Sequence, residues 1–247
     1  QVLNVGLAVP TAPVVVAANA PSVTYQSSDP YFSSVVLLLH MDGTNASTTI
    51  TDSSQANNII NAANGAMLST SQFKYGLSSC SFNGTSSYIT TNSNTALRFG
   101  YGDLTIEMWI YLNNLNTIQT LYDTLPISGD GARRTGFVLT VQTSGKLDVF
   151  SDGQYRGTSN QALSINNWNH IVFTRSTSTS VCSYFVNGIK DATTFIWGLN
   201  FTDTYATIGR VGDVPNYFLN GYIDELRVSK MVRYTSNFTP AGPFANS

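Results

Sequence analysis

A series of short apolar segments, each followed by residues that favour a tight turn, constrains the fold more than any other feature. The segments are rich in Val, Ile, Phe, Tyr, Trp and Thr, which fit the half-buried surface of a pleated strand, and Asp152-Gly153 and Asn187-Gly188 supply the positive φ of tight hairpins. No window repeats its apolar residues every 3.6 positions, as a helix would. The pattern predicts an all-β fold: a two-sheet antiparallel β-sandwich of the jelly-roll kind. The segments are Val35–His40, Ser81–Thr90, Leu104–Tyr111, Gly136–Val141, Lys146–Ser151, Asn169–Ser176, Ser180–Asn187, Ala206–Gly209 and Gly221–Ser229.

Alternation along two of these segments predicts which side chains face the core, because successive residues of a strand point to opposite faces. In the segment Leu104–Tyr111 the core candidates are Leu104, Ile106, Met108 and Ile110, and the opposite side carries Glu107, Trp109 and Tyr111. In the last segment one side carries Ile223, Glu225, Arg227 and Ser229, and the other carries Tyr222, Asp224, Leu226 and Val228.

Composition limits the classes of partner. Charged residues make up 11% of the 247 residues, against about 25% in an average soluble domain, and Ser, Thr and Asn fill the polar positions, as is common in extracellular and virion proteins. The net charge of −2 comes without a basic block, which disfavours nucleic acid as a partner. The two cysteines, Cys80 and Cys182, are not in a CxxC pair, which disfavours zinc. They form either one disulfide or two small buried hydrophobic side chains.

Residues 1–30 differ from the rest of the chain. Apolar residues alternate with small or polar ones at the start, and prolines follow at positions that forbid a helix. We expect an extended N-terminal arm that either packs along its own domain or adds a strand to a neighbouring subunit. The prolines and asparagines argue against a membrane span. The residues concerned are Leu3, Val5, Leu7 and Val9 for the alternation, Pro10, Pro13, Pro21 and Pro30 for the breaks, and Asn4 and Asn19.

Five segments carry a family resemblance. They are Val36–Asp42 (VLLLHMD), Asp103–Ile110 (DLTIEMWI), Asn167–Arg175 (NWNHIVFTR), Tyr184–Gly188 (YFVNG) and Gly221–Val228 (GYIDELRV). In this order they resemble the laminin-G-like domains of the concanavalin A-like lectin/glucanase group, in the form found in tailed-phage virion proteins and bacterial surface proteins. The resemblance implies a jelly roll over residues 31–240, preceded by the arm at 1–30 and followed by a C-terminal tail at 241–247.

The acidic residues do not match a catalytic pattern. Glycosidases need two carboxyl groups beside the scissile bond, and the glucanase relatives carry them in an E-x-D-x-x-E run. This chain has only two glutamates, Glu107 and Glu225, and neither lies in such a run. There is no G-x-S-x-G elbow, and we interpret His40 and His170 as structural histidines. We therefore expect no enzymatic activity.

The resemblance implies one structural Ca²⁺, because related jelly rolls often hold it between an early strand end and the closing strand. The ligands would be Asp42 and Asp224, since the ion prefers carboxylate and carbonyl oxygens. The alternative for Asp224 is a salt bridge or hydrogen bonds to nearby loops.

Lectin-like domains stack exposed aromatic rings on sugar faces, although aromatic side chains on strands also serve as core packing. The glycan-binding candidates are Trp109, Tyr111, Tyr155, Trp197 and Tyr217. The loops Gly129–Arg134 and Val211–Tyr217 are the expected binding loops.

These observations predict a non-catalytic structural or interaction protein of a virion, an extracellular medium or a cell surface. It would be a capsid decoration, fibre or tail component, or a subunit of a surface assembly, with protein partners bound through residues 1–30, homo-oligomers included. The alternative is a secreted or cell-surface glycan-binding module.

Overall fold

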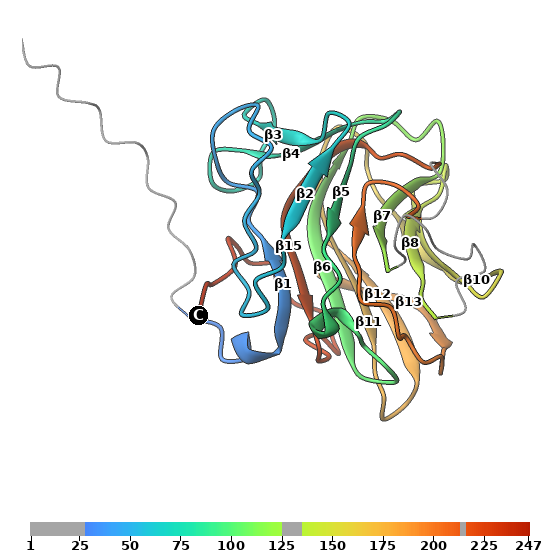
Figure 1. The fold of residues 1–247 in the computed structure, drawn as a ribbon. Helices are drawn as coiled ribbons and strands as arrows, with labels where there is room; N and C mark the ends of the chain where they lie inside the picture. The colour runs from blue at the N-terminus through green and yellow to red at the C-terminus, as the bar shows by residue number, and fades with distance from the viewer. Residues whose placement is uncertain (1–27, 125–134, 213–215) are drawn as a thin grey trace, which may run out of the picture.

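The computed structural model describes residues 28–124, 135–212 and 216–247, which form two antiparallel sheets packed face to face (Figure 1). This confirms the predicted all-β sandwich. Most of the arm, the loop 129–134 and residues 213–215 of the second predicted loop lie outside the described residues. No helix of the described part is long and apolar enough to cross a membrane.

Sheet A is built around the two longest apolar strands of the sequence. In spatial order it contains β13 (Ile189–Ile196), β12 (Val181–Val186), β11 (Trp168–Arg175), β6 (Leu104–Leu112), β15 (Asn220–Ser229), β4 (Ser79–Asn83) and β3 (Met67–Ser69), with β1 (Val35–Leu39) also paired to β15. Sheet B contains β10 (Gln154–Ala162), β9 (Lys146–Ser151), β8 (Val138–Val141), β7 (Gln119–Asp123), β14 (Thr207–Ile208), β5 (Tyr88–Thr91) and β2 (Ile60–Ala63). Two single-turn 3₁₀ helices, η1 (Phe32–Ser34) and η2 (Thr95–Leu97), complete the secondary structure of the described residues.

The core lies between the sheets. The four residues predicted on the inner side of β6 are all fully buried there, which confirms that assignment: Leu104, Ile106, Met108 and Ile110. Cys80 and Cys182 are buried and unbridged in the same cluster. They therefore serve as small hydrophobic side chains, and the disulfide alternative does not hold.

A β-bulge in β15 overturns the predicted alternation of that strand. The pairing of β15 with β6 shifts between Asp224 and Arg227, and Glu225 has a φ of 49°. The extra residue of a bulge changes which side chains face inward. Ile223 therefore shares the core with Leu226 and Val228 rather than opposing them.

The outer face of sheet A is covered by the end of the chain. The segment 230–247 crosses this face, and Phe244 is buried against it. The backbone N–H of Asp29 donates to the carbonyl oxygen of Ser247 at 2.7 Å, so the first described residues lie beside the last ones. Asp29 and Phe244, which lie outside the predicted domain limits of 31 and 240, are both buried.

Candidate functional site

A buried ion-pair network holds the C-terminal segment against the centre of sheet A. Arg227 of β15 contacts Glu107 of β6 at 2.8 Å and Asp29 at 3.1 Å, and Arg233 contacts Asp29 at 2.8 Å. The Tyr234 hydroxyl donates to Glu107 at 2.9 Å. Burial alone would raise the pKa of Glu107, but Arg227, with help from His170 and Arg233, lowers it to about 2. Glu107 is thus an ionised structural group with its oxygens occupied.

The two tryptophans among the predicted glycan ligands are not exposed. Trp109 is 7% exposed, with the Lys74 ammonium 4.2 Å from its ring centroid and the rings of Tyr75 and His170 at 5.8 and 5.1 Å. Trp197 is 3% exposed and packs in the core, 4.6 Å from the Phe201 ring. Stacking on a sugar needs a free ring face, so the expectation that these two rings are exposed was wrong.

The three tyrosines among those candidates remain accessible but lie apart. Tyr155 on β10 is 54% exposed and Tyr217 is 38% exposed. Tyr111 on β6 is half-buried between the rings of Trp168 and Tyr222, at 5.7 and 5.9 Å. No ring contact joins any two of the three within the described part of the chain. They do not form one platform, and their role in glycan binding stays a prediction.

The two predicted metal ligands lie near each other, at a site that we call the acidic corner and that contains Asp42, Asp224 and Glu225. Asp224 is fully buried, and its Oδ2 accepts the backbone N–H groups of Lys74 and Tyr75 at 2.7 and 3.0 Å. Its Oδ1 makes no hydrogen bond with the described residues. Burial raises the pKa of Asp224 well above its usual value, and the nearby carboxylates of Glu225 and Asp42 raise it further.

His40 lies at the same corner and is held on both sides. Its Nδ1 is 2.9 Å from Glu225 Oε1, and its Nε2 is 2.7 Å from Asn246 Oδ1. Burial disfavours the imidazolium, but the Glu225 carboxylate outweighs this and raises the pKa of His40. These contacts confirm that His40 is a structural histidine satisfied by hydrogen bonds.

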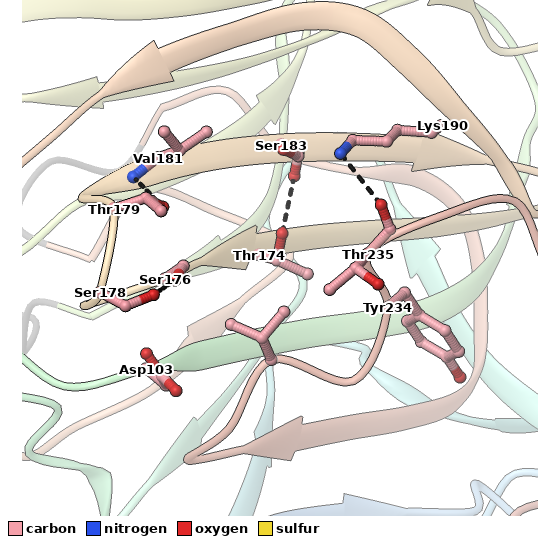
Figure 2. A pocket seen from close by; sticks show the side chains of 11 residues that line it. Asp103, Thr174, Ser176, Ser178, Thr179, Val181, Ser183, Lys190, Tyr234 and Thr235 are labelled. Atoms are coloured by element: carbon pink, nitrogen blue, oxygen red, sulfur yellow. Dashed lines mark hydrogen bonds between the residues drawn. The ribbon is translucent and has the colours of Figure 1, made fainter.

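Sequence reasoning missed a groove at the β12 end of the outer face of sheet A (Figure 2). Its volume is about 420 Å³. Figure 2 shows Asp103 at one end of the groove and Lys190 at the other, with serine and threonine side chains between them. The lining residues are Asp103, Thr174, Ser176, Ser178, Thr179, Val181, Ser183, Lys190, Val232, Tyr234 and Thr235.

Strand alternation puts the hydroxyl groups on the floor of this groove. Phe173 and Tyr184 point into the core, so their neighbours Thr174 and Ser183 point outward, directly opposite each other in the β11–β12 pair. The wall comes from the returning C-terminal segment through Val232, Tyr234 and Thr235. The run of Ser and Thr at 174–183 was the available signal, because it puts many hydroxyl groups on two predicted neighbouring strands.

The ends of the groove carry fixed charges. Asp103 Oδ1 accepts both the backbone N–H and the hydroxyl of Thr177 at 2.7 Å. Lys190 Nζ donates to the carbonyl oxygen of Thr235 at 3.1 Å, which ties β13 to the C-terminal segment. The arrangement offers hydroxyl groups, one carboxylate and one ammonium to a polar ligand.

Several solved structures with a similar fold are binding domains of toxins. The binding domain of Paraclostridial Mosquitocidal Protein 1 aligns with a TM-score of 0.61 and 16% identity, over 83% of this chain and 50% of that one. The binding domain of botulinum neurotoxin serotype D aligns with a TM-score of 0.59 and 15% identity, over 82% and 50%. This chain therefore spans about half the length of those domains, and at such identity the likeness shows the fold alone. No curated protein matches the sequence.

A family match goes further than these structures. Residues 83–235 match the sequence profile of the concanavalin A-like lectin/glucanases superfamily, in its laminin-G form. The matched region includes β6, β11 and β12 and ends with the residues that wall the groove. Since it spans more than half of the chain, this protein belongs to the concanavalin A-like lectin/glucanases superfamily.

Proposed function

We propose that this protein is a non-catalytic recognition module of a virion or cell surface, and that it binds saccharides in the groove beside β12. The groove itself carries the proposal. Its volume of about 420 Å³ falls within the range of roughly 300–1,000 Å³ typical of small-ligand sites. Its lining is dominated by hydroxyl groups, which can both donate to and accept from the hydroxyl groups of a sugar.

The two glutamates of the chain are both held in buried contacts, which supports a non-catalytic role. Glycoside hydrolysis needs one carboxyl group to protonate the leaving group and a second to attack or to activate water. Glu107 is ionised beneath the C-terminal segment, and Glu225 is buried against His40 and the backbone N–H of Phe244. Neither lines the groove.

The structural neighbours favour recognition of a cell surface. One, a binding domain of botulinum neurotoxin DC, was solved in complex with SialylT. Another comes from botulinum neurotoxin type C, whose cell entry depends on interaction with two ganglioside molecules. A third was solved with rat synaptotagmin II. These ligands belong to those proteins, so they support a binding function for this fold and leave the ligand of this chain to experiment.

The test is a calorimetric titration with neutral and acidic tetrasaccharides. Replacing both floor hydroxyls with Thr174→Val and Ser183→Ala should weaken binding about tenfold. The control is Thr70→Val with Ser71→Ala, which removes two exposed hydroxyls from the turn after β3. Equal binding by both double variants, or no binding by the unchanged protein, would contradict the proposal.

A second proposed role is assembly through residues 1–30, as a capsid decoration, fibre, tail or surface-assembly subunit. The anchoring of Asp29 by Arg227 and Arg233 supports it, because a force on the arm would be transmitted to the sheet. The solution mass of the full chain should be compared with that of a chain lacking residues 1–27, which keeps Asp29. An oligomer that becomes a folded monomer on truncation supports this role; two monomers contradict it.

We also propose one structural Ca²⁺ at Asp42 and Asp224. Asp224 Oδ1 is buried without a hydrogen-bond donor, which fits an oxygen ligand, and a side chain at Gly76 would collide with the Asp42 carboxylate. The described residues hold no cluster of three acidic, histidine or cysteine side chains for a metal. Backbone carbonyls and water would therefore supply the other ligands.

A further inference from the structure

The charges at the two ends of the groove give it a direction. We infer that the groove selects acidic saccharides, with a carboxylate of the ligand at Lys190 and neutral sugar hydroxyls at Asp103. This inference rests on the proposed saccharide binding and adds the ligand class and its orientation.

Lys190 is positioned to receive an anion. Its Nζ is fixed by one bond to Thr235, and its backbone N–H is fixed by Asn237 Oδ1 at 2.9 Å. An ammonium has three N–H donors, so two remain for a ligand. Lys190 forms no ion pair with any described residue, and it is the one cation among the lining residues. A carboxylate that binds here replaces no internal partner.

Asp103 sets the opposite requirement. Thr177 occupies its Oδ1 with two short bonds, which hold the carboxylate in place at the edge of β6. The remaining oxygen accepts hydroxyl donors but repels a second carboxylate. An acidic ligand is therefore oriented with its carboxylate at Lys190 and away from Asp103. One carboxylate in the ligand is enough for this orientation.

The floor between the two ends favours a sugar over an acidic peptide. Ser176 and Ser178 present accessible hydroxyl groups, Thr174 and Ser183 are buried in the floor, and Val232 is one of only two aliphatic side chains in the lining. Sugars carry hydroxyl groups that both donate and accept, so they suit a lining of hydroxyl groups, whereas the several carboxylates of an acidic peptide would find one cation, Lys190.

The experiment compares one oligosaccharide in two forms. Tetragalacturonate and its carboxyl-reduced counterpart differ only at the carboxyl groups, and both are titrated into the full chain at low and at 0.5 M salt. We expect tetragalacturonate to bind about tenfold more tightly at low salt, equivalent to about 1.4 kcal/mol. Salt should reduce that preference, because exposed ion pairs are screened.

Variants assign the preference to its residues. Lys190→Gln should remove the preference for the acidic form, so that tetragalacturonate and its reduced counterpart bind this variant with the same affinity. Asp103→Asn should weaken the reduced form and weaken tetragalacturonate less, because the substitution also removes the repulsion between Asp103 and the ligand carboxylates. The control is Lys146→Gln, an equal charge change on β9 of sheet B, and it should retain the preference.

The outcomes separate the two claims. Equal binding of both forms by the unchanged protein overturns the acidic selectivity and leaves saccharide binding intact. Binding of neither form overturns the proposed function and this inference with it. Tight binding of an Asp/Glu tetrapeptide that Lys190→Gln abolishes, without tetragalacturonate binding, assigns the groove to an acidic peptide and overturns the saccharide.

Discussion

Two parts of the same sheet face have opposite properties. At the centre of the outer face of sheet A, Glu107 and Arg227 are buried and paired beneath the C-terminal segment. At its β12 end, Asp103 and Lys190 stand at the edges of an open groove without ion pairs to described residues. The strands are continuous between the two parts. What differs is whether the returning chain lies on top of them, so the path of residues 230–247 decides where this face stabilises the fold and where it can bind.

The largest expected effect is at the covered centre. Arg227→Ala would leave Glu107 as a buried charge without its main partner, and breaking a buried pair in this way costs about 3–5 kcal/mol. Chemical denaturation measures the free energy of unfolding. Lys190→Ala removes a cation from the groove as a matched control, and it should change the free energy of unfolding by less than about 0.5 kcal/mol. Similar losses in both variants would erase the distinction between the two parts.

The next effect is on the pH dependence of stability. The pKa of Glu107 is about 2 in the folded protein, against 4.5 ordinarily. A lowered folded pKa contributes stability that is present above pH 4.5 and lost as the pH falls toward 2. At about 1.4 kcal/mol per pH unit, the contribution is roughly 3 kcal/mol. Between pH 4.5 and 2, Glu107→Gln should lose less stability than the unchanged protein, and parallel curves would contradict the assignment.

The calcium proposal gives an effect of similar or smaller size at the acidic corner. At a free Ca²⁺ concentration 100 times Kd, binding to the folded state adds about 2.7 kcal/mol. The melting temperature should therefore fall on chelation, and Asp224→Asn should abolish that response. Asp152→Asn, an exposed acid in the β9–β10 turn, should leave the response unchanged. A melting temperature insensitive to chelator, with no ion found by metal analysis, removes the site.

The smallest change in stability is expected on the groove floor. Thr174→Val alters a side chain whose hydroxyl is 3.5 Å from the carbonyl oxygen of Ser183, a weak bond, so unfolding should change by less than about 0.5 kcal/mol. Any loss of saccharide affinity in this variant then reports binding. A variant that loses affinity only in proportion to a lowered melting temperature would assign Thr174 to the scaffold.

The sequence predicted the central strands because they carry the apolar pattern. Short apolar runs between turn residues located β6, β11 and β12, and the segment predicted at 81–90 is in fact β4 and β5, separated by a turn and placed in different sheets. The edge strands β10 and β13 were missed, since most of their side chains are polar and at least partly exposed. The short strands β2 and β3 and the buried central strand β7 were missed as well. The strand conformation of β10 and β13 comes from backbone pairing with β9 and β12, and a single sequence does not display its pairing partners.

The candidate site was less accessible to sequence reasoning than the fold. Alternation placed Glu107 and Trp109 on the outward side of β6 correctly, but it did not reveal that the C-terminal segment and Lys74 cover them. Asp42 and Asp224 were found through the order of family motifs, and the structure brings them to one corner. The groove joins residues 103, 174–190 and 232–235, whose proximity depends on tertiary packing alone.

The hydrogen bond between Asp29 and Ser247 has a topological consequence. With the two positions 2.7 Å apart from N to O, a linker of a few residues could join them into a ring without disturbing either sheet. The chain could then be opened at a tight turn such as Ser144-Gly145, giving a circular permutant with the same strand pairing. For the same reason, residues 29–247 could be inserted into a surface loop of a host protein, since the first and last of these residues are adjacent.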